Sequence, residues 1–165
     1  MRTILLTVLM LSSWQVYGTE TTIEMLNRSG DEMMVFSKPL VHVNIGDSVL
    51  WKATDKTHSV AFVKGGVPTN VAVFKSPFNQ DARYVFKSPG IYVYKCVAHY
   101  GMGMIGMVVV GEDQHNLPAV QALDLMPAPR KKLNQVLKVL LDHSSTTSPA
   151  IKVNKTSPSM PITRP

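Results

Sequence analysis

The chain has 165 residues, a net charge of +6 and a single cysteine, Cys96. This length suits one domain with extensions, and one cysteine excludes a disulfide within the chain. The 13 Lys and Arg against 11 Asp and Glu of residues 19–142 leave that part at only +2, with the cations scattered; this argues against a nucleic-acid-binding protein and suits steering toward an acidic protein partner.

The first 18 residues have the pattern of a secretory signal peptide. Arg2 supplies the positive charge, residues 4–11 a short apolar run, and residues 16–18 the exit. We therefore expect export, with cleavage after about Gly18. The apolar run is too short to cross a bilayer, so we predict no membrane insertion. An uncleaved anchor or a buried strand is the alternative.

Residues 21–111 show short β-prone runs separated by turns. Residues 41–45 alternate apolar and polar side chains, and residues 48–51 resume after the turn at Gly46-Asp47. Short strands at this spacing predict an all-β sandwich or barrel. The later strands are expected at residues 83–86, 91–95 and 105–110.

After Gly111 the period of the apolar residues changes to that of helices. Residues 117–123 fit a short helix, and a longer one follows beyond Pro127 and Pro129. We expect both to pack on the sandwich, with partner binding as the alternative. The apolar stripe of the longer helix is Leu133, Val136, Leu137, Leu140 and Leu141.

Residues 143–165 are rich in Ser, Thr, Pro and Lys, and this composition predicts a disordered tail.

Cys96 begins the segment with the most distinctive chemistry. His99 and Met104 follow in the loop between two predicted strands. In an exported protein a cysteine usually pairs, so Cys96 is a buried inert thiol, half of an intermolecular disulfide, a nucleophile or a metal ligand. Thiolate, imidazole and thioether form a soft donor set, which suits copper that cycles between two oxidation states.

A second imidazole would complete a trigonal site of two histidines and one cysteine with a weak axial methionine. Among the five histidines, His58 is the best candidate because it lies in a polar turn that enters an apolar run. The remaining three suit surface or capping roles: His42, His115 and His143. Since methionine is also a common packing residue, the residues alone leave the axial ligand open among Met102, Met104 and Met107.

Several segments, in order, resemble the pseudoazurins, which are type 1 (blue) copper proteins of the cupredoxin fold. The most specific part is the spacing Cys-x₂-His-x₄-Met from Cys96, with Thr-Asp-Lys-x-His upstream at residues 54–58. The resemblance extends over residues 20–142, and its other segments are residues 34–36, 46–47, 72–76, 89–92 and 95–111.

The resemblance implies a cupredoxin-like Greek-key β-sandwich with two C-terminal α-helices, over residues 19–142. It also implies one type 1 copper ion per chain, held by His58, Cys96, His99 and Met104.

The function that the resemblance implies is that of a soluble periplasmic electron carrier, not an enzyme. Electrons would pass through the edge of His99 to an acidic redox partner, such as a copper nitrite reductase of denitrification, and we expect a monomer. The partner would dock on Ala98, Tyr100, Gly101 and Met102, with Lys56, Lys64, Lys75 and Lys95 around them.

Two residues depart from the family pattern near the expected site. Ala98 stands where these loops usually carry proline, and Ser59 stands where an asparagine usually follows the first histidine and braces the ligand loop. Groups around metal ligands tune potential and affinity, so we expect a retained copper site with a shifted potential.

Two other classes of function compete with electron transfer. A multicopper oxidase would carry histidines beside the cysteine, and Lys95 and Val97 stand there instead. Copper carriage or storage would use several exposed Met or Cys side chains. We interpret the patterned methionines as core residues, which disfavours carriage: Met25, Met33, Met34, Met107 and Met126.

Overall fold

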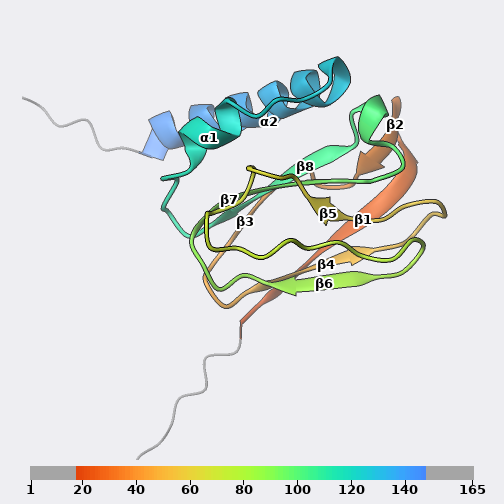
Figure 1. Ribbon diagram of the computed structural model, residues 1–165, viewed down its shortest axis with the longest axis horizontal. Coiled ribbons are helices and arrows are strands. Elements are labelled where there is room, and N and C mark those ends of the chain that lie inside the picture. The colour runs from red at the N-terminus through yellow and green to blue at the C-terminus, as the bar shows by residue number, and fades with distance from the viewer. Residues whose placement is uncertain (1–17, 148–165) are drawn as a thin grey trace, which may run out of the picture.

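The computed structural model describes residues 18–147 of the chain. Two four-stranded sheets face each other, and two helices cover the outer face of one sheet, which gives three layers (Figure 1). The first sheet has the order β2-β1-β4-β6 and the second the order β3-β8-β7-β5. The predicted Greek-key sandwich with two C-terminal helices is confirmed.

Five strands lie within about two residues of the predicted runs, namely β3, β4, β6, β7 and β8, whereas no separate run was predicted for β1, β2 or β5. Pairing is antiparallel except between β1 and β4 and between β3 and β8, which are parallel. The bounds are β1 (Glu20–Ser29), β2 (Glu32–Phe36), β3 (Leu40–Val43), β4 (Ser48–Lys52), β5 (Ala61–Phe62), β6 (Ala82–Val85), β7 (Gly90–Lys95) and β8 (Ile105–Val110).

Strand β8 is buried along its whole length, which explains its unbroken apolar sequence. Val108 and Val110 face the other sheet, in a core cluster that also contains Trp51. Ile105 and Met107 face the helices, in a second cluster. The second sheet is thus the middle layer, and its strands β7 and β8 carry the loop described below.

Gly106 leaves room for the Tyr94 side chain of β7 to lie across β8. It pairs directly with Tyr94, and a Cβ at Gly106 would lie 2.4 Å from the Tyr94 ring. Tyr94 is fully buried, with its ring edge-on to Phe36 at 4.8 Å and to Trp51 at 5.1 Å between ring centroids. Burial raises the pKa of Tyr94, so it stays a neutral core residue.

Helices α1 (Leu117–Gln121) and α2 (Pro127–Thr147) pack on the middle sheet as predicted. Two details of the prediction are wrong. Leu141 is 43% exposed, because the buried stripe of α2 ends at Leu140. The helix also continues through residues 143–147, which we expected in the tail; residues 148–165 lie outside the described part. No helix among the described residues is long and apolar enough to cross a membrane.

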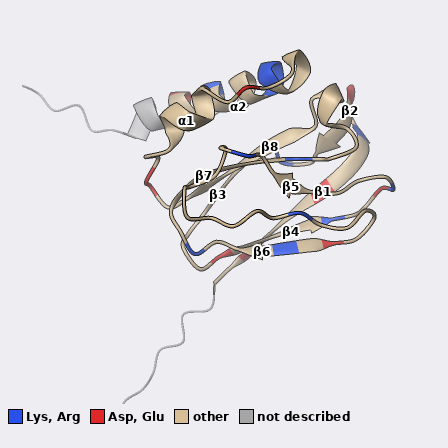
Figure 2. Ribbon diagram, in the orientation of Figure 1, with Lys and Arg blue, Asp and Glu red and all other residues tan. Residues whose placement is uncertain are grey.

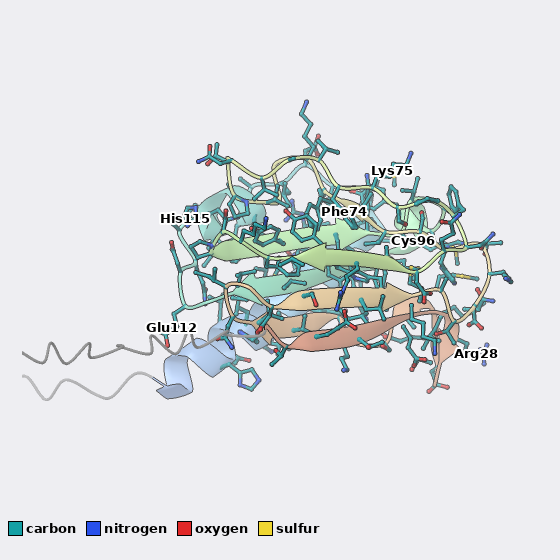
Figure 3. All side chains as sticks on the ribbon, turned by 90° about the horizontal axis from the view of Figure 1, so that it is seen from below. Arg28, Phe74, Lys75, Cys96, Glu112 and His115 are labelled. Carbon is teal, nitrogen blue, oxygen red and sulfur yellow. The ribbon has the colours of Figure 1, made fainter. Side chains whose placement is uncertain are left out.

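The charged residues do not form one basic face. Lys and Arg lie on both sheets and near the start of α2, with Asp and Glu between them (Figure 2). Seen from below, Cys96 and Arg28 lie toward one end of the sandwich, and Glu112 and His115 toward the other (Figure 3).

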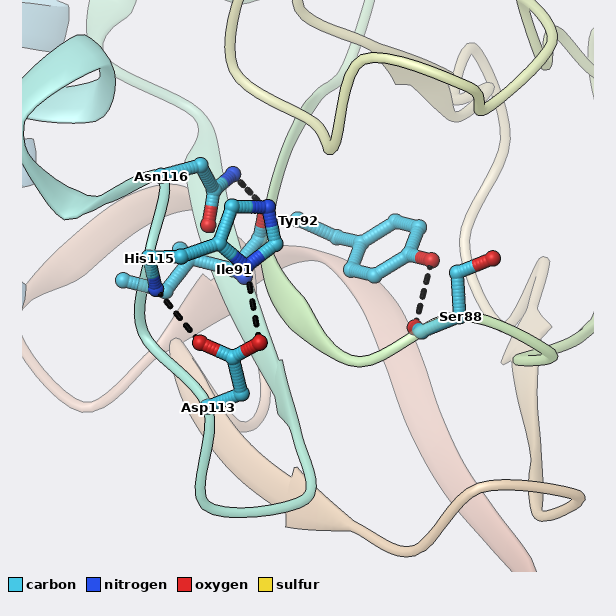
Figure 4. Close-up of polar contacts among 6 residues, drawn as sticks. All are labelled: Ser88, Ile91, Tyr92, Asp113, His115 and Asn116. Atoms are coloured by element: carbon cyan, nitrogen blue, oxygen red, sulfur yellow. Dashed lines mark hydrogen bonds and ion pairs between the residues drawn. The ribbon is translucent and has the colours of Figure 1, made fainter.

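The end remote from Cys96 is held by side-chain bonds to the start of β7 (Figure 4). Asn116 Oδ1 accepts from the Ile91 amide at 2.9 Å, and Asn116 Nδ2 donates to the Ile91 carbonyl at 2.8 Å. The Tyr92 hydroxyl donates to the Ser88 carbonyl at 2.8 Å, and burial raises its pKa to about 12. His115 pairs with Asp113 at 3.0 Å, a surface role as expected.

Candidate metal centre

The loop between β7 and β8 brings Cys96, His99 and Met104 close together. The Cys96 amide donates to the Met104 carbonyl at 3.0 Å, and the Met104 amide donates to the His99 carbonyl at 3.3 Å. A single turn of 3-10 helix, η1 (Tyr100–Met102), fills the loop and ends at Gly103, whose φ of 91° favours glycine. The loop is therefore closed on the two central strands of the middle sheet.

His58 reaches the same point from the turn between β4 and β5. Its carbonyl accepts from the Asn79 amide at 2.8 Å. Two residues on, the Val60 amide donates to Ser76 Oγ at 3.0 Å, and the Ser76 amide donates back to the Val60 carbonyl at 2.8 Å. The segment that contains Ser76 and Asn79 thus holds the chain at His58 and two residues after it.

Three donor atoms of these residues form a compact triangle. Cys96 Sγ lies 3.7 Å from His58 Nδ1 and 3.6 Å from His99 Nδ1, and the two nitrogens are 3.2 Å apart. A triangle with these sides has a point about 2 Å from each corner, close to the usual length of a bond from imidazole to a transition metal. The arrangement therefore has room for one metal ion among the three donors.

Met104 lies beside this triangle, in the buried cluster that contains Cys96. Its side chain is 1% exposed, whereas Met102, three residues after His99, is 57% exposed. Met107 is buried but faces the helices, in the other cluster. Of the three methionines that the residues left open, Met104 is thus the one in the cluster of Cys96, and the four residues are positioned as in a type 1 copper site.

Asn27 on β1 sets the tautomer of His58. Asn27 Oδ1 lies 3.0 Å from His58 Nε2, and an amide oxygen can only accept a hydrogen bond. The proton of a neutral His58 therefore sits on Nε2, and Nδ1 keeps its lone pair for a metal. The backbone N–H of Asn27 donates to Asp55 Oδ2 at 2.6 Å, which ties β1 to the turn before His58.

Burial favours the neutral form of His58, the form that binds metals. His58 and Cys96 are fully buried. Burial and then the neighbouring His99 lower the pKa of His58 below its ordinary value, and Asp55 opposes them in part. A metal at Nδ1 therefore has little competition from a proton at neutral pH.

The two residues that depart from the family pattern differ in their surroundings. Ser59 is fully buried, and its hydroxyl has no hydrogen-bond partner among the described residues. It therefore makes no side-chain bond to the ligand loop. Ala98 is exposed, next to the partly exposed His99. Because its hydroxyl is buried without a partner, we expect Ser59 to affect the copper centre more than Ala98 does.

The residues expected to dock a partner are all exposed or partly exposed. His99 Nδ1 faces the other donors, so the Nε2 edge of its ring lies on the opposite side, and the residue is partly exposed. Lys56 and Lys75 are exposed, and Lys95 Nζ lies 4.2 Å above the Tyr100 ring. Lys64 is exposed but lies farther from Cys96. The amide of the preceding residue, Val63, donates to the carbonyl of Val93, three residues before Cys96 on β7.

Asn27 is the residue near the centre that the sequence prediction missed. In the sequence it is only the first residue of an Asn-Arg-Ser triplet. Its contact with His58 depends on the parallel pairing of β1 with β4, which no local pattern reveals.

Comparison with known proteins agrees with this geometry. Residues 23–111 match the family model of copper binding proteins of the plastocyanin/azurin family. The chain is 37% identical to a pseudoazurin of Methylorubrum extorquens, over 70% of this chain and 78% of that one. It is 35% identical to a pseudoazurin of Paracoccus pantotrophus, over 70% and 79%.

Solved structures lead to the same family. The crystal structure of pseudoazurin from Methylobacterium extorquens AM1 superposes with a TM-score of 0.71 at 36% identity, and covers 73% of this chain and 98% of that one. Pseudoazurin from Hyphomicrobium denitrificans gives 0.69 at 33% identity, over 73% and 97%. The chain therefore belongs to the plastocyanin/azurin family of copper-binding proteins and, within it, to the pseudoazurins.

Proposed function

We propose that this chain is a one-electron carrier whose copper ion would be held by His58, Cys96, His99 and Met104. The observation that carries the proposal is the triangle of buried soft donors, 3.2 to 3.7 Å on a side. Copper bound there supplies one-electron exchange between its two oxidation states. The sandwich holds the donors in place, so little needs to rearrange when the charge changes.

The partly exposed edge of His99 is the route by which electrons enter and leave. It lies among Ala98, Tyr100, Gly101 and Met102, which are small or weakly polar and suit the small contact of a transient redox complex. The exposed Lys56 and Lys75 and the partly buried Lys95 would attract an acidic partner at rates that depend on salt. Lys64 contributes least, given its place along β7.

The partner that we propose is an acidic redox protein, and in particular a denitrification reductase such as copper nitrite reductase. The setting is the periplasm, reached through the signal peptide of residues 1–18, most of which lies outside the described residues. The test is nitrite reduction by a copper nitrite reductase with the reduced chain as sole electron donor. Steady turnover that weakens with added salt supports the proposal, and no turnover at any ionic strength contradicts this choice of partner.

Copper carriage is the second candidate, and one observation favours it. Met33 and Met126, which we expected in the core, are 52% and 47% exposed, so this part of the prediction is wrong. Met33 lies on β2, and Met126 directly precedes α2, where its methyl carbon lies 3.7 Å from a Cβ placed on Gly101. Exposed thioethers near the ligand loop are the kind of ligand that a copper carrier would use.

A further inference from the structure

Three methionines line one surface hollow beside the ligand loop. The hollow has a volume of about 330 Å³ and lies between β2, the end of η1 and the first turns of α2. Figure 1 shows the turn of η1 next to β2, with the start of α2 above them. Met33 and Met34 contribute from β2 and Met102 from η1. Single exposed methionines are ordinary, but three around one hollow are not explained by chance exposure.

The backbone of β2 is shaped so that two consecutive methionines reach the hollow. In a regular strand, neighbouring side chains point to opposite faces. Met34 has a φ of +52°, in the left-handed region that residues other than glycine rarely adopt. Met33 and Met34 both line the hollow nevertheless. The unusual backbone conformation at Met34 thus coincides with two neighbouring thioether side chains that line the same hollow.

The other donors of the hollow disfavour hard cations. Glu32 supplies its carboxylate, and Lys132 Nζ already binds both oxygens, at 2.7 and 2.9 Å. The positive charges of Lys131 and Lys132 oppose any cation in the hollow, but they oppose a monovalent ion such as Cu(I) less than a divalent one. Mg²⁺ or Ca²⁺ would need several free oxygen ligands. Neutral thioethers are soft ligands and select Cu(I).

The hollow also shares residues with the wall of the copper centre. The Met102 amide donates to the carbonyl of His99 at 3.0 Å. Met34 packs against the buried cluster that holds Cys96 and Met104. An ion in the hollow would therefore lie beside the loop that carries His99.

We propose that Met33, Met34 and Met102 form a second metal site, which binds one Cu(I) ion through three thioether sulfurs at the surface. This site is additional to the buried centre and goes beyond electron transfer. Binding needs no redox step, because Cu(I) exchanges its solvent ligands for thioethers and no proton is released. The site would hold copper beside the loop that carries Cys96 and His99.

The test uses the full mature chain with its buried centre already filled with one equivalent of Cu(I). A second equivalent of Cu(I) is added without oxygen, as its acetonitrile complex, and the methionine methyl groups are followed by carbon-13 NMR. We expect the methyl signals of Met33, Met34 and Met102 to shift together and to saturate at one added equivalent. Absence of a shift, or shifts that never saturate, would overturn the proposal.

Matched variants separate this site from general affinity of methionine for copper. Met33→Leu should weaken binding of the second ion about tenfold or more, since one donor of three is lost. Met126→Leu removes an equally exposed methionine that does not line the hollow, and should leave binding unchanged. Equal effects of the two variants would overturn the proposal. The visible band of the Cu(II) form reports the Cys96 centre separately, so a failure there is distinguishable from a failure here.

Discussion

Asn27 is not a metal ligand, but we expect its side chain to affect how tightly the ligands bind copper. Its oxygen fixes the proton of His58 on Nε2. Asn27→Ala should lower copper affinity by about tenfold to a hundredfold, as loss of partners behind metal-bound histidines commonly does. Competition with a copper chelator measures this. Ser29→Ala, at the exposed end of the same strand, is the control, and equal affinities in the two variants would show that Asn27 has no such role.

The buried hydroxyl of Ser59 makes an unusual stability prediction. Because Ser59 Oγ has no partner among the described residues, Ser59→Ala should raise the free energy of unfolding by about 1 kcal/mol. Ser76 is the matched control: it is also buried, and its hydroxyl accepts from the Val60 amide and donates to the Pro77 carbonyl. Ser76→Ala should be destabilising by about 1–3 kcal/mol. Urea unfolding of the metal-free protein measures both, and a loss of stability in Ser59→Ala would contradict the account.

The lowered pKa of His58 predicts a pH dependence of the metal-free protein. The unfolded chain titrates His58 near 6.5 and the native chain at lower pH. Below about pH 6.5 the unfolded state therefore binds more protons, and stability falls as the pH falls. Thermal unfolding between pH 7.5 and 5 should show this fall, and His58→Gln should reduce it. An unchanged slope in the variant would mean that His58 is not the group responsible.

At the scale of elements, β7 and β8 must keep their close pairing for the ligand loop to close. Gly106→Ala would place a methyl group 2.4 Å from the Tyr94 ring in a fully buried position. We expect a loss of about 2 kcal/mol or more in stability, measured by denaturant unfolding. Gly101→Ala is the control, since its nearest neighbour is 3.7 Å away. A neutral effect at Gly106 would show that Tyr94 can move aside.

The elements also show which parts of the structure a sequence can predict. Strands such as β8 were predictable because an unbroken apolar run indicates a buried strand. The ligands of the loop, Cys96, His99 and Met104, were predictable because they are close together in the sequence. Asn27 was not, because the pairing of β1 with β4 brings it to His58. Met33 and Met126 were misassigned, since apolar character does not show whether a neighbour covers the residue. Leu141 was misassigned as well, because it continues the apolar period of α2 beyond Leu140, the last residue of the buried stripe.

For the whole molecule, the position of the charges matters more than their sum. Helix α2 packs against the ligand loop and places Lys131 beside Met102. The sequence prediction did not include this cation among those that steer a partner. Lys131→Glu should slow oxidation or reduction by the anionic hexacyanoferrate couple at low salt, and the difference should vanish at high salt.

Lys138→Glu provides the matched control on the same helix. Lys138 is exposed two turns farther along α2, away from the ligand loop. Because screened charges act over about 10 Å, its effect on the stopped-flow rate should be clearly smaller. Equal effects of Lys131→Glu and Lys138→Glu would indicate that only net charge counts, and would contradict steering toward the His99 edge.

The visible absorption spectrum of the mature chain with one equivalent of Cu(II) is the decisive test of a type 1 copper site at Cys96. We expect an intense thiolate-to-copper band that disappears on reduction and is absent in Cys96→Ser, because Cys96 Sγ is the only thiolate that the centre can supply. A chain that binds Cu(II) without this band, or keeps it in Cys96→Ser, would contradict a type 1 site at Cys96 and the electron-carrier function built on it.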